Sequence, residues 1–146
     1  MANKQKVGLI GLGDMGSGMA KNLIKNGFQT YGYDLSPQRL SAFKVLGWKC
    51  VADPQEMGPL VDVVFIMVMN GGQVENVIFG DRGLVHSLQQ GSGIIVTATI
   101  KASEIRTIAN KLEGSKIHLI DSPVSGGFPG ALGGTLTMMA ARSEDS

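Results

Sequence analysis

The spacing G-x-G-x-x-G occurs near the start of the chain, and residues at this spacing can bind the phosphates of a nucleotide. They are Gly11, Leu12, Gly13, Asp14, Met15 and Gly16. The first glycine permits a tight turn, the second lets the backbone approach a pyrophosphate, and the third lets a helix pack on a strand. Amides at the helix start then face the anion. The alternative is a plain turn, because a chain with 21 glycines contains such spacings by chance.

An acidic residue, Asp34, follows the next β-like run about 20 residues after the glycines, where a ribose-binding acid is expected. A carboxylate there can accept hydrogen bonds from both ribose hydroxyls of adenosine, and it repels a phosphate on the 2′ position. The sequence therefore predicts NAD as the cofactor, with NADP less favoured. Asp34 could also be a helix cap or turn residue before Ser36 and Pro37, and the two roles are compatible.

Short apolar runs alternate with helix-length amphipathic segments, which is typical of βαβ units. The predicted strands are residues 6–10, 29–33, 49–51, 63–69, 93–97 and 116–120. The predicted helices are residues 17–26, 37–46 and 103–112. Residues 63–69 are apolar at every position, as expected of a central strand covered on both faces. The pattern predicts an α/β fold of the Rossmann type, doubly wound around a mostly parallel sheet.

The composition indicates one domain with a hydrophobic core, because 146 residues are too few for two domains. The net charge of +1 is spread without basic blocks, which argues against nucleic acid or an anionic membrane as a partner. No apolar run is long enough to span a membrane, and the polar residues 1–6 do not resemble a secretory signal. We therefore expect a cytoplasmic protein.

The cysteine and the histidines predict no further chemistry. Cys50 is the one cysteine of the chain, which excludes an internal disulfide, and its β-like surroundings indicate a buried, inert thiol rather than a nucleophile. His86 and His118 have no second ligand at metal-binding spacing, so we expect no metal site.

A second motif follows the last predicted strand, where the composition shifts to glycine, serine and proline in residues 121–134. Taken alone, its centre could equally be a flexible turn or a binding loop. Consecutive glycine amides can form a concave anion site, and a serine hydroxyl adds a donor without charge. Because ligands collect at the carboxyl ends of parallel strands, an ordered binding loop is expected here.

The two motifs together resemble the β-hydroxyacid dehydrogenase family, which includes 3-hydroxyisobutyrate, tartronate semialdehyde and L-threonate dehydrogenases. The resemblance implies that Ser125, Gly126 and Gly127 hold the carboxylate of a small hydroxyacid substrate. It also implies cofactor contacts beyond the glycine motif and Asp34, at Leu35, Val68, Met69, Gln73 and Thr99. The chain departs from the family pattern at Met69, Gln73 and Ala98, where proline, asparagine and serine are frequent. Details around residues 70–73, 77–80 and 99–100 are most similar to the L-threonate branch.

Such enzymes need a group that takes the hydroxyl proton as hydride moves to the nicotinamide, and the family uses a lysine in a second, all-helical domain. No segment here matches that lysine motif, so no catalytic residue is predicted in this chain. We expect the lysine beyond Ser146, residues 1–146 as an incomplete cofactor-binding domain, and a homodimer or homotetramer for the full-length enzyme. The alternatives are an imine or semialdehyde reductase on the same scaffold, or a non-catalytic NAD-sensing module.

Overall fold

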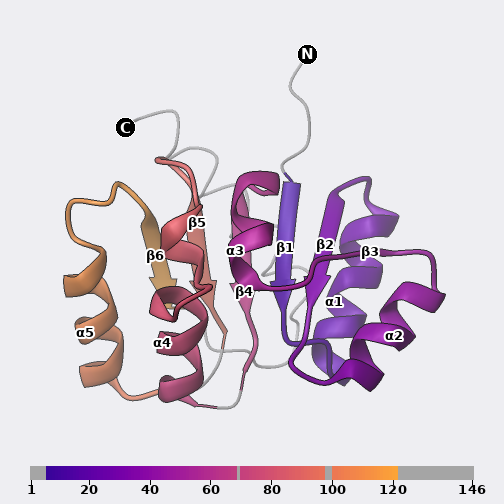
Figure 1. Ribbon diagram of the computed structural model, residues 1–146, viewed down its shortest axis with the longest axis horizontal. Helices are drawn as coiled ribbons and strands as arrows, with labels where there is room; N and C mark the ends of the chain where they lie inside the picture. Colours follow the sequence, from indigo (N-terminus) through magenta and orange to yellow (C-terminus); the bar gives the residue numbers. More distant parts are fainter. Residues whose placement is uncertain (1–5, 69, 98–99, 122–146) are drawn as a thin grey trace.

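The chain folds into a parallel β-sheet with helices packed on both faces (Figure 1). The computed structural model describes residues 6–68, 70–97 and 100–121, with only the backbone of Asp14 and Met15. The strands are β1 (Lys6–Ile10), β2 (Gln29–Tyr33), β3 (Lys49–Cys50), β4 (Val63–Ile66), β5 (Gly93–Val96) and β6 (His118–Asp121). The helices are α1 (Asp14–Lys25), α2 (Pro37–Val45), α3 (Pro54–Met57), α4 (Gly71–Phe79) and α5 (Ala102–Leu112). Two 3-10 turns, η1 (Gly58–Leu60) and η2 (Leu84–His86), complete the described elements.

The strand order is β3-β2-β1-β4-β5-β6, and every described pair is parallel. Because the order reverses between β1 and β4, the sheet is doubly wound, and the predicted fold class is confirmed. Ile10 at the end of β1 pairs with Tyr33 of β2 on one side and Ile66 of β4 on the other. These three strands therefore end at one edge of the sheet, where ligands bind in folds of this type.

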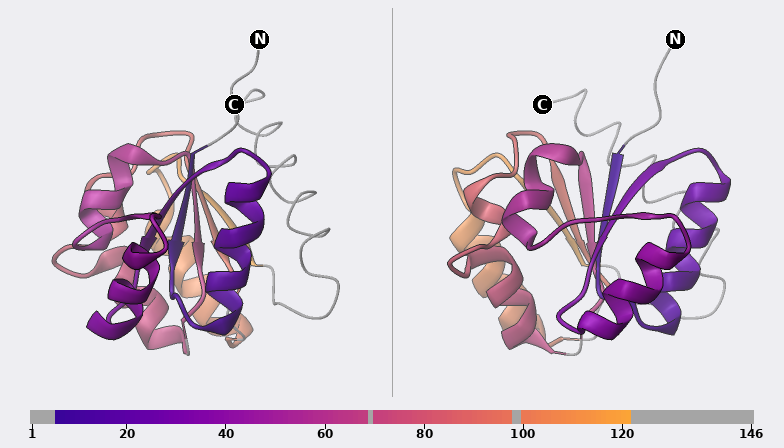
Figure 2. Two further views of the ribbon diagram at one scale, coloured as in Figure 1. Left: turned by 90° about the vertical axis from the view of Figure 1, so that its right-hand side faces the viewer. Right: turned by 45° about the vertical axis from the view of Figure 1, so that its right-hand side comes forward.

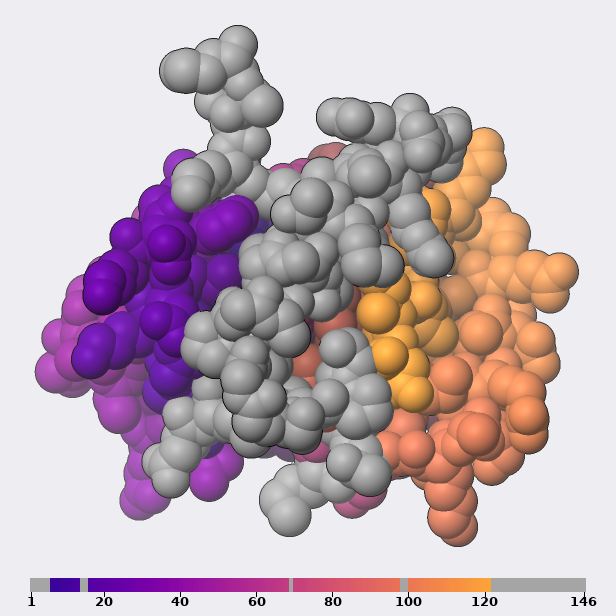
Figure 3. Space-filling view, turned by 180° about the vertical axis from the view of Figure 1, so that it is seen from behind, coloured from indigo at the N-terminus to yellow at the C-terminus, as the bar shows by residue number. Residues whose placement is uncertain are grey.

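The two faces of the sheet have separate hydrophobic cores. One core packs α3, α4 and α5 against side chains such as Ile10, Ile66 and Val96. The other packs α1 and α2 against the alternate residues of the strands, including Leu9 and Phe65. Figure 2 shows helices on both sides of the sheet, and Figure 3 shows the molecule from behind, with α1 (indigo) on one side and α5 (orange) on the other. All four residues of β4 are buried, which confirms its predicted central place.

Four strands have bounds that differ from the prediction, and β3 and β5 differ only by ending one residue earlier, at Cys50 and Val96. β4 ends at Ile66 because its partners end at Ile10 and Val96, although the N–H of Met67 still donates to the Ile10 carbonyl at 2.8 Å. Met69, the predicted last residue of this strand, lies outside the described residues. β6 begins at His118 rather than Lys116, because Lys116 has a φ of 61° and belongs to a turn.

The helices also differ from the prediction, chiefly because glycines hide helical residues. α1 begins at Asp14, inside the glycine motif, rather than at residue 17. The family resemblance places a helix start at Gln73, and the structure begins α4 two residues earlier, at Gly71, where Asn70 caps it by accepting a hydrogen bond from the Gln73 N–H at 2.9 Å. Among the described helices, none is both long and apolar enough to cross a membrane.

Candidate nucleotide-binding site

The glycine turn joins β1 to α1 at the carboxyl edge of the sheet, and two of its glycines are required by the protein itself. Gly11 has a φ of +106°, and its N–H donates to the Tyr33 carbonyl at 2.9 Å. A Cβ atom at Gly11 would collide with the Met67 carbonyl oxygen, and one at Gly16 would collide with the Gly11 carbonyl oxygen. Both positions are glycine because strand, turn and helix touch through their backbones.

Gly13 differs from the other two, because its surroundings would accept a side chain. The nearest atoms to a Cβ built there belong to the Arg39 guanidinium, at 3.7 Å or more, which is ordinary contact. Gly13 is also the N-cap residue of α1, and its carbonyl accepts the Ser17 N–H at 2.8 Å. With no side chain to cap the helix, the first-turn amides are left for another acceptor. The surrounding protein therefore does not require a glycine at this position, in contrast to Gly11 and Gly16, and a role of Gly13 in cofactor binding stays a prediction.

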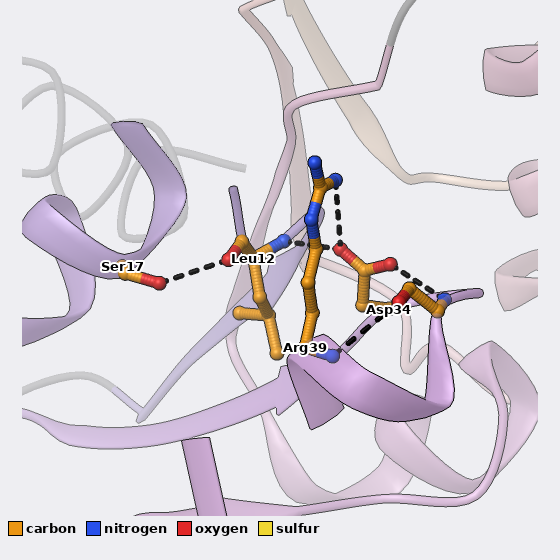
Figure 4. Close-up of polar contacts among 5 residues, drawn as sticks. Leu12, Ser17, Asp34 and Arg39 are labelled. Carbon is orange, nitrogen blue, oxygen red and sulfur yellow. Dashed lines mark hydrogen bonds and ion pairs between the residues drawn. The ribbon is translucent and has the colours of Figure 1, made fainter. Parts of the chain in front are cut away.

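Asp34 follows β2 directly, and its carboxylate ties the glycine turn to the start of α2 (Figure 4). Oδ2 accepts the Leu12 N–H at 2.7 Å, and Oδ1 accepts the Ser36 N–H at 2.7 Å. Ser36 in turn caps α2, because its Oγ accepts the Arg39 N–H at 3.3 Å. A carboxylate has about four acceptor positions, so these bonds leave room for hydroxyl donors. Asp34 thus has the turn role that was expected as the alternative, and its binding of ribose stays a prediction.

Leu12 positions Asp34 from within the turn. Its side chain is buried in the core beneath α1, and its N–H is the donor to Asp34. Its carbonyl accepts the Ser17 hydroxyl at 2.9 Å, which fixes the turn against the first turn of α1. The backbone conformation of the turn is therefore held from both sides before any ligand binds.

A cleft of about 700 Å³ extends from this corner along the edge of the sheet. Its size lies within the range of small-molecule and cofactor sites. The predicted cofactor residues that line it are Gly11, Asp34, Leu35, Val68 and Gln73. Whether they contact a cofactor stays a prediction. The predicted residues Met69, Thr99, Ser125, Gly126 and Gly127 lie outside the described residues, as do the side chains of Asp14 and Met15.

The lining of the cleft also contains a charged pair that the sequence analysis did not identify, Asp53 and Arg82. Asp53 caps α3 by accepting the Glu56 N–H at 2.8 Å, and its other oxygen pairs with Arg82. The bond from Glu56 is the main reason why the pKa of Asp53 lies below its ordinary value, and Arg82 adds to the effect. Burial raises the pKa of Tyr33, and the nearby carboxylates of Asp53 and Asp34 raise it further. Asp53-Pro54 followed by Glu56 is a helix-start signal that could have placed Asp53.

The cysteine and the two histidines of the chain all lie within the described residues. Cys50 is half-buried rather than fully buried, and burial raises the pKa of its thiol. His86 is exposed, with Nε2 2.9 Å from the Gly80 carbonyl oxygen, and His118 lies on β6. Within the described ranges, no group of three or more His, Cys, Asp or Glu residues could hold a metal ion.

Comparison with known proteins identifies relatives of this fold and site. L-threonate dehydrogenase of Haemophilus influenzae is 38% identical over 141 residues, which are 96% of this chain and 47% of that protein. Mouse mitochondrial 3-hydroxyisobutyrate dehydrogenase is 36% identical, over 99% of this chain and 43% of its own length. A crystal structure of 3-hydroxyisobutyrate dehydrogenase from Salmonella typhimurium has a TM-score of 0.78 and 31% identity, covering 96% of this chain and 52% of its own.

The chain thus spans about half the length of the curated relatives it matches. The family model for the NAD-binding domain of 6-phosphogluconate dehydrogenase matches residues 6–146. That match agrees with the order of the parallel strands, the glycine turn after β1 and the acid after β2. This chain belongs to the family of NAD-binding domains of the 6-phosphogluconate dehydrogenase type.

Proposed function

We propose that this chain is the cofactor-binding part of an NAD-dependent dehydrogenase that acts on a small β-hydroxyacid of the threonate or 3-hydroxyisobutyrate type. The observation that carries the proposal is the Asp34 carboxylate, buried beside the glycine turn and fixed by the Leu12 N–H at 2.7 Å. An acid fixed in this way is suited to binding the ribose hydroxyls of a dinucleotide whose pyrophosphate lies on the turn.

Residues of the cleft and of the glycine turn beside it suit the parts of the cofactor. The amides at the start of α1, opened by Gly13, would bind the pyrophosphate, and Asp34 would bind the adenosine ribose. Leu35, which is 68% exposed and lines the cleft, would contact the adenine together with Val68 and Gln73. We propose that Thr99 and Met69 contact the nicotinamide part of the cofactor.

The reaction needs a substrate site and a proton acceptor as well as a cofactor. Bound NAD supplies the hydride acceptor. We propose that Ser125, Gly126 and Gly127 hold the substrate carboxylate and that a lysine in a second domain takes the hydroxyl proton. The relatives named as L-threonate and 3-hydroxyisobutyrate dehydrogenases support this substrate class. We further propose a homodimer or homotetramer for the whole enzyme and a cytoplasmic location.

Calorimetric titration of the chain with NAD and NADP tests the cofactor proposal. We expect saturable binding of NAD, tighter than that of NADP, because Asp34 accepts from the free ribose hydroxyls and repels a 2′-phosphate. Asp34→Ala should weaken the binding of NAD and narrow the difference between the affinities for NAD and NADP. Absence of saturable binding of either nucleotide would overturn the proposed function.

A substrate panel tests the activity. The enzyme that contains this domain should oxidise one or more of threonate, 3-hydroxyisobutyrate and glycerate, or reduce tartronate semialdehyde, with the nicotinamide absorbance as readout. Turnover of cyclic imines alone would favour the reductase alternative. Cofactor binding without turnover of any compound would favour a sensing module.

A further inference from the structure

The first turns of α4 and α5 meet through a close contact between Gly71 and Glu104. The two helices lie side by side on one face of the sheet (Figure 1). Gly71 is the buried first residue of α4, and Glu104 is a half-buried residue in the first turn of α5. A Cβ atom at Gly71 would collide with Oε2 of Glu104. The carboxylate therefore lies directly on the backbone of α4, where a side chain on residue 71 would displace it.

The carboxylate of Glu104 is held in this place by its own helix. Oε1 accepts the Lys101 N–H at 3.0 Å, which caps the start of α5. Oε2 is the oxygen that lies against Gly71. A negative charge at the N-terminus of a helix interacts favourably with the helix dipole, so this carboxylate also stabilises the start of α4. One side chain thus links the first turns of both helices.

The first turn of α4 has few side chains of its own that could fix its position. Gly71 and Gly72 have none, and glycine disfavours a helix because it loses the most backbone freedom on folding. The buried Val74 and Ile78 anchor the helix to the sheet from its fourth residue onward. The bond from the Gln73 N–H to Asn70 closes the turn within α4. Glu104 supplies a link from this turn to another element.

The same turn forms part of the wall of the cleft. Asn70, Gly72 and Gln73 line the cleft, whereas Glu104 does not. Gln73 is one of the predicted cofactor residues, and its N–H is the donor to the Asn70 cap. A shift of the turn would therefore change the shape of the cleft and the position of Gln73 in it. A carboxylate outside the cleft thus acts on residues that line it.

Another polar contact joins the same two helices away from the cleft. Lys111 of α5 donates to Oε1 of Glu75 of α4 at 3.0 Å, and its Nζ lies 5.2 Å from the centre of the Phe79 ring. None of these three residues lines the cleft. Both members of the ion pair are largely accessible to water, which weakens the attraction between them. The pair therefore provides a comparison in which α4 and α5 are linked without contact to the site.

We propose that Glu104 is a positioning residue of the cleft, whose carboxylate holds the first turn of α4 where Asn70, Gly72 and Gln73 can meet the cofactor. The effect on cofactor binding rests on the proposed function, because it requires a dinucleotide in the cleft. The effect on the helix does not, and it can be measured without a ligand. Removal of the carboxylate should both loosen the first turn of α4 and lower the affinity for NAD.

Hydrogen exchange followed by mass spectrometry tests the effect on α4 in the absence of a nucleotide. The N–H groups of Gln73 and Val74 donate to the side chain and the carbonyl of Asn70, so they report opening of the first turn. In Glu104→Ala they should exchange about three- to tenfold faster than in the wild type. Glu104→Gln should give an intermediate rate, because it keeps an oxygen that can accept the Lys101 N–H and loses the charge.

Glu75→Gln is the matched control for the exchange experiment. It weakens the ion pair with Lys111 between the same helices and should leave the exchange of Gln73 and Val74 unchanged. Exchange in Glu104→Ala equal to that in the wild type would overturn the inference. So would equal acceleration by Glu75→Gln and Glu104→Gln, since any loosened contact between the helices would then have the same effect.

Calorimetric titration with NAD tests the effect on the cleft. Glu104→Ala should lower the affinity about three- to tenfold, Glu104→Gln should lower it less, and Glu75→Gln should match the wild type. Gly71→Ala should also lower the affinity, because the added methyl displaces the carboxylate. The double variant Gly71→Ala with Glu104→Ala should bind NAD no more weakly than Gly71→Ala alone, since both substitutions remove the same contact.

The outcomes separate this inference from the proposed function. Circular dichroism verifies the fold of each variant, and Glu104→Gln replaces Glu104→Ala in every comparison if the latter does not fold. Wild-type affinity for NAD in a folded Glu104 variant, or full additivity of the Gly71 and Glu104 substitutions, would overturn the inference and leave the proposed function standing. Absence of saturable NAD binding by the wild type would overturn the proposed function, and the exchange rates would still decide whether Glu104 holds α4.

Discussion

The Leu12 N–H donates to Oδ2 of Asp34 at 2.7 Å, and this bond joins the glycine turn after β1 to the residue after β2. Both partners are buried, with Leu12 3% and Asp34 9% exposed. The acid that is proposed to bind ribose is therefore also a structural acceptor for the turn that is proposed to bind phosphate. A substitution of Asp34 is therefore expected to change both the stability of the folded chain and the binding of the ligand.

Asp34→Ala is expected to lower the free energy of unfolding by about 1–3 kcal/mol, because it leaves the buried Leu12 N–H without its acceptor. Asp34→Asn should cost less, since its side-chain oxygen can still accept one N–H. Urea denaturation of the two variants measures the difference. The matched control is Asp62→Ala, because Oδ2 of Asp62 accepts the Lys6 N–H at 2.9 Å at an exposed position. Equal losses for Asp34→Ala and Asp62→Ala would contradict the structural role of the bond.

The glycines of the turn are expected to separate folding from binding. Gly13→Ala should leave the stability of the chain nearly unchanged, because the added methyl meets only the flexible Arg39 side chain at 3.7 Å. Gly13→Ala should lower the affinity for NAD about tenfold or more, because the methyl occupies the space through which a pyrophosphate approaches.

Gly16→Ala is the paired variant with the opposite expectation. A Cβ atom there collides with the Gly11 carbonyl oxygen, so the variant should lose about 1–3 kcal/mol of stability or more. Thermal unfolding compares the stability of the two variants, and titration with NAD compares their affinity for the cofactor. A destabilised Gly13→Ala, or a Gly16→Ala as stable as the wild type, would show that the division of roles among the glycines is wrong.

The sequence predicted the parts of the site that local chemistry determines. The glycine spacing identified the turn, and its distance to Asp34 identified an acid after the next strand, because each depends on neighbouring residues in a strand–turn–helix unit. The hydrogen bond from the Leu12 N–H to Asp34 was not predicted. The sheet was also predictable, since buried parallel strands are continuous apolar runs such as β4.

What the sequence missed depends on residues that meet only in the folded chain. The end of β4 is set by the ends of β1 and β5, which no property of residues 63–69 reveals. The pair of Asp53 and Arg82 joins residues 29 positions apart, and the approach of Arg39 to Gly13 depends on how α2 packs. The resemblance placed the start of α4 at Gln73 rather than at Gly71, because Gly71 and Gly72 disfavour a helix, although the buried Val74, Val77 and Ile78 have helical spacing.

Stability is expected to depend on pH through Asp53. Since its folded-state pKa lies below the ordinary value, the ionised carboxylate stabilises the folded chain above pH about 4, and this stabilisation is lost as the pH falls through the lowered pKa. Asp53→Asn keeps a capping oxygen and loses the charge, so its deficit relative to the wild type should shrink between pH 5 and pH about 3. Glu113→Gln, an exposed carboxylate after α5, is the control. Parallel stability curves for the wild type and Asp53→Asn would contradict the assignment.

Cys50 is expected to be a slow nucleophile in the folded chain. Burial raises the pKa of its thiol, Lys44 partly opposes the shift, and Sγ lies 3.8 Å from the Leu40 carbonyl oxygen. At pH 7.5 the reactive thiolate is therefore scarce, and the half-buried position limits access further. Alkylation by iodoacetamide should be about tenfold or more slower than in the urea-unfolded chain, and Lys44→Ala should slow it again by raising the pKa. Because the chain has one cysteine, a single rate constant reports the reaction, and a folded-state rate equal to the unfolded one would refute the prediction.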